Sequence, residues 1–315
     1  MTAIRTVLGD IAPAALGAVD AHEHLFQVSR ILPGDELDDP VLSREEAASL
    51  LASGFAAMID ATPIGLGRKP AEVAAISAAT GLGVIASTGM HREAHYADDH
   101  PLRAWSAERR AAAFVRDIVE GMPQHDGPDA PPALHGGVAV RAGMIKAGVG
   151  YWSISSFERT TLEGAAIAHA STGAAVMVHL ERGTAGHEVL DLLESLGVRA
   201  SRVLLAHADR LVDPGHHVEL LARGCALGYD GMARWREHSD HELVELTAAV
   251  VERGADRILL GGDVARASRY LAYGGMPGLA YLGLRYLPRL REGIGAATVE
   301  RMLVEHPRRL LALSA

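Results

Sequence analysis

The chain has 315 residues, of which 49% are hydrophobic and 22% are charged, and its formal net charge is −9 at pH 7. A (β/α)8 barrel commonly runs to this length as one domain, so we expect a single domain over residues 1–315. The acidic balance argues against a nucleic-acid-binding protein, which would present a basic face.

The sequence lacks the patterns expected of secreted and membrane proteins. A single cysteine, Cys225, leaves no partner for a disulfide within the chain. Residues 1–24 contain a short apolar patch that acids soon interrupt, which is unlike a signal peptide. No run of about 18 apolar residues is present, so we expect no transmembrane helix and a cytoplasmic protein.

Short apolar runs recur along the chain and are typical of buried strands. They lie at residues 18–24, 56–61, 83–88, 139–146, 174–179, 202–207, 224–229 and 257–263. Longer amphipathic segments between the runs predict helices at 43–55, 108–122, 161–173, 186–197, 242–254 and 297–306. Ser43 and Glu46 have the spacing of a capping box at the start of the first helix.

This alternation predicts parallel βαβ units wound into a (β/α)8 barrel, an α/β fold, with a doubly wound open sheet as the alternative. The Pro- and Gly-rich stretch 121–137 is expected to be a long loop within the same domain.

The ends of the apolar runs carry the candidate site residues, because chemistry in such barrels occurs at the carboxyl ends of the strands. Run one ends in His22 and His24, run five in His179, run six in His207 and run eight in Asp263. Imidazoles and carboxylates are typical ligands of Zn²⁺, with manganese, cobalt and iron as alternatives. Five ligands exceed what one catalytic zinc takes, which indicates two divalent ions. Alternatively, each histidine alone could be a structural residue bonded to the backbone.

Lys146 ends the fourth run and is chemically unusual among these residues. Its ammonium would repel metal ions, so we expect the amine to be neutral or modified. A buried lysine with a lowered pKa can add CO₂ to give a carbamate, whose two oxygens are able to bridge two cations.

The motifs resemble the phosphotriesterase family of the amidohydrolase superfamily, from about residue 8 to the C-terminus. They include DAHEH (20–24), STGMH (87–91), AGMIKAG (142–148), LLAHADR (204–210) and LLGGDVAR (259–266). The resemblance implies a binuclear metal hydrolase with a hydroxide between the ions. It implies that His22, His24 and Asp263 hold the buried ion, that His179 and His207 hold the exposed one, and that carboxylated Lys146 bridges both. Asp263 would also take the proton during attack.

Candidate substrate contacts are His91, Tyr229 and Arg234. Relatives often carry an aromatic residue near the position of His91, and the loops after strands seven and eight set specificity in such barrels. Arg234 could bind an anionic group of a substrate, or it could pair in solvent with Glu237 or Asp240.

The resemblance implies a small-molecule substrate and a homodimer. A lactone or carboxylic ester, including a sugar lactone, is the expected substrate, with organophosphate triester hydrolysis as a side reaction. An N-acyl amide hydrolase and a ligand-binding barrel without turnover are the alternatives.

Overall fold

The eight predicted apolar runs form one parallel sheet in the computed structural model, which describes residues 2–126 and 130–313. Its strands, in chain order, are β3 (Val19–Glu23), β4 (Ala57–Asp60), β5 (Gly83–Gly89), β8 (Met144–Val149), β9 (Ala175–Leu180), β10 (Val203–Ala206), β11 (Ala226–Tyr229) and β12 (Ile258–Leu260). Each strand pairs with the next of these in sequence. The sheet curls until β12 lies beside β3, where the Asp263 amide donates to the His22 carbonyl at 2.8 Å.

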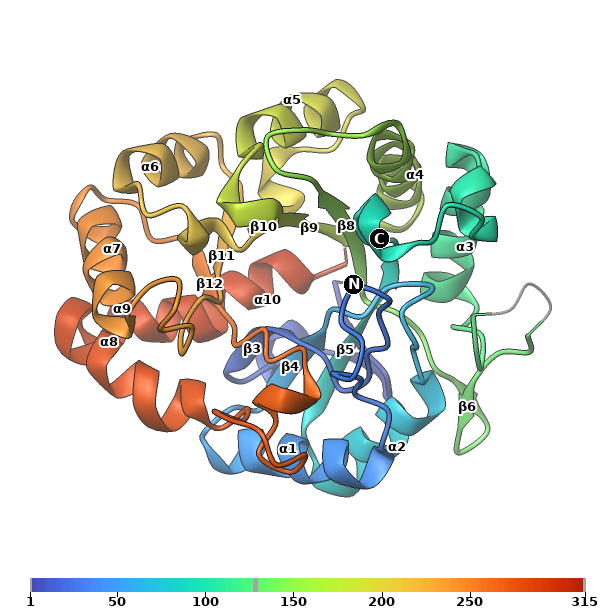
Figure 1. Cartoon of the computed structure of the whole chain (residues 1–315), viewed down its shortest axis with the longest axis horizontal. Coiled ribbons are helices and arrows are strands. Elements are labelled where there is room, and N and C mark those ends of the chain that lie inside the picture. Colours follow the sequence, from blue (N-terminus) through green and yellow to red (C-terminus); the bar gives the residue numbers. More distant parts are fainter. Residues whose placement is uncertain (1, 127–129, 314–315) are drawn as a thin grey trace.

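Helices surround this sheet in chain order, and the last of them crosses the amino end of the barrel, which confirms the fold (Figure 1). They are α1 (Pro40–Ala52), α2 (Pro70–Thr80), α3 (Ala107–Val119), α4 (Ser156–Thr172), α5 (Gly186–Ser195), α6 (Pro214–Ala222), α7 (Asp240–Glu252), α8 (Leu287–Ile294), α9 (Ala296–Glu300) and α10 (His306–Leu311). Among the described residues, no helix is long and apolar enough to span a bilayer. A cytoplasmic location stays a prediction.

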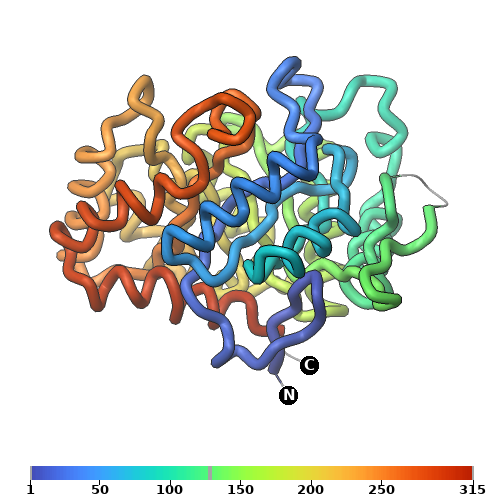
Figure 2. Tube along the Cα trace, turned by 90° about the horizontal axis from the view of Figure 1, so that it is seen from below, coloured from blue at the N-terminus to red at the C-terminus, as the bar shows by residue number. Residues whose placement is uncertain are grey.

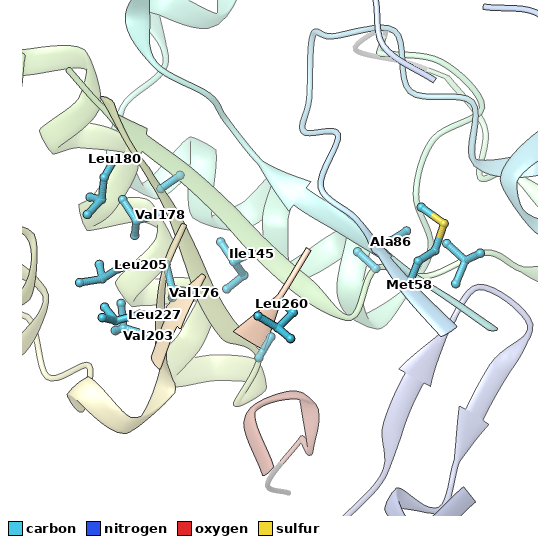
Figure 3. Packing of buried hydrophobic residues seen from close by; sticks show 14 of the residues in the cluster. Met58, Ala86, Ile145, Val176, Val178, Leu180, Val203, Leu205, Leu227 and Leu260 are labelled. Atoms are coloured by element: carbon cyan, nitrogen blue, oxygen red, sulfur yellow. The ribbon is translucent and has the colours of Figure 1, made fainter. Parts of the chain in front are cut away.

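Alternation along each strand produces two apolar layers, because successive side chains point to opposite faces of a sheet. On β9, Val176 and Val178 point outward and pack against the helices, as Figure 3 shows. Met177 points inward and packs with residues such as Ile59 and Leu259 inside the barrel. β9 is therefore apolar on both faces over most of its length, which explains why its run in the sequence is nearly continuously hydrophobic.

The amino end of the barrel is covered by the hairpin of β1 (Ile4–Thr6) and β2 (Gly9–Ile11). Ile4 packs there with Leu310 and Leu311 of α10, inside the apolar layer that fills the barrel. The chain ends also meet on this side, where the Leu313 amide donates to the Ala3 carbonyl at 2.8 Å (Figure 2). The amino end is thus closed by apolar packing.

The capping box predicted at Ser43 is wrong, because α1 starts at Pro40 and Asp39 accepts from the first free amides. Ser43 lies inside the helix and donates to the Leu25 carbonyl at 2.7 Å. Glu46 accepts from backbone amides of Ala272 and Leu279, so it ties α1 to the loop after β12.

The loop predicted over 121–137 is partly wrong as well. It contains part of a short hairpin, in which β6 (Leu134–His135) pairs with β7 (Val138–Ala139). Residues 127–129 of that stretch lie outside the described residues.

Candidate metal centre

The four predicted histidine ligands converge at the carboxyl end of the barrel. The ring centroid of His22 lies 5.5 Å from that of His24 and 4.9 Å from that of His207. His179 extends the group, with its ring centroid 4.3 Å from that of His207. All four side chains are buried. One imidazole cluster thus forms from residues at the ends of three strands. Its members lie up to 185 positions apart in the sequence.

Asp263 and Lys146 complete this cluster. The Oδ1 atom of Asp263 lies 3.8 Å from Nε2 of His22 and 3.7 Å from Nε2 of His24. The Nζ atom of Lys146 lies 3.1 Å from the same Nε2 of His22. All six predicted ligands therefore face a common space.

Lys146 reaches this space from the interior of a strand, and its predicted place at the strand end is wrong. β8 continues to Val149, and Ile145 (labelled in Figure 3) and Ala147 point outward into the helix-facing layer. Alternation then directs Lys146 into the barrel, where it is fully buried. Gly89 of β5 allows this register, because a Cβ at Gly89 would lie 1.9 Å from the Lys146 carbonyl oxygen.

A bulge in β3 orients the first two histidines. Asp20 pairs with Met58 and Glu23 with Asp60, so β3 has one more residue than β4 between these pairs. An extra residue changes which face the following side chains occupy. Ala21 and His22 consequently both point into the barrel, Ala21 in its apolar layer and His22 at its mouth.

His207 and Asp263 have backbone φ angles of 64° and 45°, in the left-handed region that residues other than glycine rarely adopt. Leu205 points outward and Ala206 inward, so a continued strand would direct His207 outward. The left-handed backbone instead turns its ring into the mouth. Strain of this kind, about 1 to 3 kcal/mol per residue, is typical of functional sites.

Asp230 fixes the tautomers of two of the histidines. Its carboxylate accepts from Nδ1 of His22 at 2.9 Å and from Nδ1 of His207 at 2.5 Å. Each ring therefore carries its proton on Nδ1, and the lone pair of Nε2 points away from Asp230 into the space that Lys146 also enters, where it can bind a metal. Asp230 was missed in the sequence because it follows the last residue of the seventh run by one position.

The other two histidines have equivalent partners. Thr62 donates its hydroxyl to the Phe26 carbonyl, so its oxygen accepts from Nδ1 of His24 at 2.8 Å. His179 uses the opposite nitrogen, since its Nε2 lies 3.1 Å from the Glu181 carboxylate and donates to it. The free lone pairs are therefore Nε2 of His24 and Nδ1 of His179. An oxygen partner on the second nitrogen is a general property of metal-binding histidines.

Burial keeps these donors in their metal-binding protonation states. Burial and neighbouring cationic groups lower the pKa values of His24, His179 and His207 well below the usual value, so the rings are neutral. Burial also lowers the pKa of Lys146 to about 8, against the opposing effect of Asp263. The Lys146 amine is therefore much more often neutral than that of a surface lysine.

Asp263 is ionised in spite of its burial. Burial alone would raise its pKa, but Arg234, His207 and His22 hold the pKa far below its usual value. Its Oδ2 atom lies 2.5 Å from Nη2 of Arg234 and 2.9 Å from Nη2 of Arg210. The expected pairing of Arg234 with Glu237 or Asp240 in solvent is thus replaced by an ion pair within the site.

Two buried acids of β3 hold the backbone on either side of Asp263. The Asp20 carboxylate accepts from the Gly262 amide at 3.3 Å, and Glu23 accepts from the Val264 amide at 2.8 Å. Burial raises the pKa of Asp20 to about 7 and that of Glu23 well above its usual value. These acids are not among the predicted ligands, and their position explains how the loop holds its strained residue.

A cavity of about 780 Å³, open to solvent, lies above the cluster. Of the predicted substrate residues, His91 and Arg234 line it. The Arg92 amide donates to Nδ1 of His91 at 2.7 Å, which leaves the proton of that ring on Nε2. The prediction for Tyr229 is wrong, because its hydroxyl hydrogen-bonds to Nδ1 of His217 at 2.5 Å, outside the cavity. Tyr229 is two positions after Leu227 on β11, so both side chains point outward, away from the barrel interior.

The residues of this cluster fit a pair of divalent cations. His22, His24 and Asp263 each offer a ligand atom within 4.8 Å of the others'. Neutral imidazoles with one fixed nitrogen, an ionised carboxylate and a buried amine form a donor set that suits zinc and similar ions.

Comparisons with known proteins agree with this site. A model of the phosphotriesterase family matches residues 2–311. The chain is 30% identical to a phospho-furanose lactonase from Mycoplasmopsis synoviae, over 98% of this chain and 91% of the relative.

Two solved structures are similar over nearly their whole length. A lactonase from Listeria monocytogenes has a TM-score of 0.89 and 26% identity, over 99% of this chain and 100% of the other. The phosphotriesterase homology protein of Escherichia coli, solved with phosphate in its active site, has a TM-score of 0.84 and 28% identity, over 96% and 100% of the two chains. The chain is therefore a hydrolase that belongs to the phosphotriesterase family.

Proposed function

We propose that the protein is a binuclear metal hydrolase that opens lactones, with sugar lactones carrying an anionic group as its substrates. The observation that carries this proposal is that each of the four clustered histidines has one ring nitrogen hydrogen-bonded to an oxygen, which leaves the lone pair of the other nitrogen for a metal. The proposed ligands are His22, His24 and Asp263 for the inner ion, His179 and His207 for the outer ion, and carboxylated Lys146 for both. Zinc is the proposed metal, with manganese, cobalt and iron as alternatives.

Lys146 is well placed to become a carbamate. Its Nζ atom contacts Nε2 of His22 and Sδ of Met177, both at 3.1 Å. Neither of these two contacts brings a negative charge to the amine, and burial lowers its pKa to about 8. A neutral amine that attacks CO₂ forms an N–C bond and releases one proton, and its product is an anion with two oxygens.

Divalent cations held by these residues would supply an activated water molecule and would polarise the oxygen of a substrate carbonyl. In lactone hydrolysis the water oxygen bonds to the carbonyl carbon, the ring C–O bond breaks, and a water proton moves to the ring oxygen. Asp263 is the proposed carrier of that proton. Its Oδ1 faces the imidazoles and its Oδ2 faces Arg210 and Arg234. His91 presents an N–H donor that can bind a substrate oxygen.

The charged lining of the cavity supports an anionic substrate. It consists of Arg92, Arg182, Arg210, Arg234 and Arg266, against Glu181, Glu237 and Asp263. Guanidinium groups bind phosphate and carboxylate through paired hydrogen bonds. The phospho-furanose lactonase from Mycoplasmopsis synoviae, named for such a substrate, further supports a phosphorylated sugar lactone.

A substrate panel, measured before and after chelation, tests this proposal. We expect turnover of lactones that chelation abolishes and added zinc restores, with kcat/KM about tenfold or more higher for phosphorylated sugar lactones. Organophosphate triesters are expected to react more slowly, since their phosphoryl oxygen can occupy the place of the carbonyl oxygen.

Other outcomes would contradict the lactonase proposal. Preference for N-acyl amides would assign the same metals to amide hydrolysis. Full metal content without turnover of lactones, esters, amides or phosphoesters would identify a binding protein.

We also propose a homodimer. Leu271 and Met276, in the loop after β12, are 57% and 75% exposed, and exposed apolar patches mark protein–protein interfaces. Light scattering by the purified protein measures the mass directly.

A further inference from the structure

A second cluster of metal-binding side chains lies between the first turns of α5 and α6, apart from the site described above. His187 is the second residue of α5, His216 is the third residue of α6, and Glu219 lies about one turn further along α6. Each residue offers one ligand atom, and these atoms lie within 4.8 Å of one another. Two imidazoles and a carboxylate are the ligands that many zinc sites use.

Helix geometry brings these donors together. His216 and Glu219 are three positions apart on α6, so their side chains share one face of the helix. α5 and α6 are neighbours around the barrel (Figure 1), and the rings of His187 and His216 are 5.2 Å apart. Nε2 of His187 lies 3.7 Å from the Glu219 carboxylate.

The Nε2 atom of His216 is the strongest indication of a missing partner. It is buried from solvent and has no hydrogen-bond partner among residues 2–126 and 130–313. A buried polar atom without a partner carries a free-energy cost of about 1 to 3 kcal/mol. A cation bound by this nitrogen would remove that cost.

The positive charge of Arg223, a neighbour of His187, is already neutralised. Arg223 lies on the Nδ1 side of the ring, with its guanidinium 2.6 Å from the Glu194 carboxylate and 2.8 Å from that of Asp191. Its contact with Nδ1 is long, at 3.5 Å, and the same Nη1 atom donates to the His187 carbonyl at 3.2 Å. Binding of a cation at Nε2 therefore disturbs only a weak contact.

We propose that His187, His216 and Glu219 bind one zinc ion, with water in the fourth position. The Glu219 side chain is 71% exposed and can move toward the two imidazoles. The ion would join the first turns of α5 and α6, which follow the strands that carry His179 and His207. It would hold those two segments together at the rim of the barrel.

Zinc binding by the whole protein tests this site. We expect wild-type protein, dialysed against a series of free zinc concentrations, to bind one more zinc ion per chain than His187→Ala or His216→Ala. Glu219→Gln, which changes an exposed side chain and preserves the fold, should weaken binding of that ion about tenfold or more. The test relies on a difference between variants, so it does not depend on how many ions the barrel mouth holds.

His241→Ala is the matched control. His241 likewise pairs with a glutamate, since its Nε2 atom lies 3.2 Å from the carboxylate of Glu245 on the same helix, α7. This pair offers a metal only two ligand atoms, one fewer than the proposed site. His241→Ala should therefore bind as much zinc as the wild type. Equal zinc binding by the wild type and by the His187, His216 and Glu219 variants at every concentration would overturn the proposal.

Discussion

Two regions of the barrel supply proposed ligands to the same centre, but they hold these ligands differently. One is the corner where β3 meets β12, and the other is the side formed by β9. At the corner, Asp263 is held by the buried acids Asp20 and Glu23. On the β9 side, His179 has one partner, Glu181, whose side chain is 25% exposed and also pairs with Arg92 at 3.1 Å. The comparison indicates a rigid corner, which fixes the inner ion, and an adjustable side that faces the substrate.

Lys146 lies between the two regions, so its removal should have the largest effect. We expect Lys146→Ala to lower kcat/KM on the order of 10³-fold or more, because both proposed ions lose an anionic ligand. Short carboxylic acids should partly restore activity by occupying the place of the carbamate. Lys69→Ala is the control, since Lys69 is the other lysine and its ammonium lies over the Phe26 ring, 5.2 Å from the centroid. Full activity of Lys146→Ala without added acid would refute the bridging role.

Glu23 tests the rigidity of the corner. Glu23→Ala removes the acceptor for the Val264 amide and should lower kcat about 10 to 100-fold, with weaker metal retention after dialysis. Glu23→Gln keeps an acceptor of the same shape and should stay within about threefold of the wild type, because burial raises the pKa of Glu23 and favours its neutral form. If the two variants behaved alike, the backbone hydrogen bond would not position Asp263.

Glu181 tests the adjustable side. Glu181→Gln preserves an acceptor for His179 and weakens the ion pair with Arg92. We expect less than about a tenfold loss of kcat/KM, carried mainly by KM. A loss as large as that of Glu23→Ala would show that both regions are equally rigid.

Tyr229 gives the smallest expected effect on catalysis. Tyr229→Phe removes the hydrogen bond to His217 and should lower the free energy of unfolding by about 1 kcal/mol, with kcat/KM unchanged. Denaturant titration and a lactone assay on the same preparation separate the two effects. Altered substrate preference would place Tyr229 in the substrate site after all.

The barrel was predictable from sequence because it depends on local periodicity, and the six proposed ligands were found by looking at the ends of the apolar runs. Eight apolar runs of strand length, separated by amphipathic segments, leave few folds other than a parallel barrel. The fourth run was placed too early because Val138 and Ala139 pair in a separate hairpin while Lys146 belongs to the interior of β8.

Features that depend on the tertiary structure were not predictable. The bulge in β3 and the left-handed backbones of His207 and Asp263 depend on neighbouring strands, and no local pattern indicates them. Asp230 acts through two histidines from other strands, so its role follows only from the folded arrangement. Tyr229 failed as a substrate residue because alternation directs it away from the mouth.

The meeting of Ala3 and Leu313 at the amino end has a practical consequence. Both ends of the described chain lie together on one side of the molecule (Figure 2), at the amino end of the barrel, whereas the cavity is at the carboxyl end. Joining them with a short peptide and opening the chain in a surface loop should give a permuted enzyme with an intact mouth. Tethering the protein to a solid support through either end should likewise leave substrate entry unobstructed.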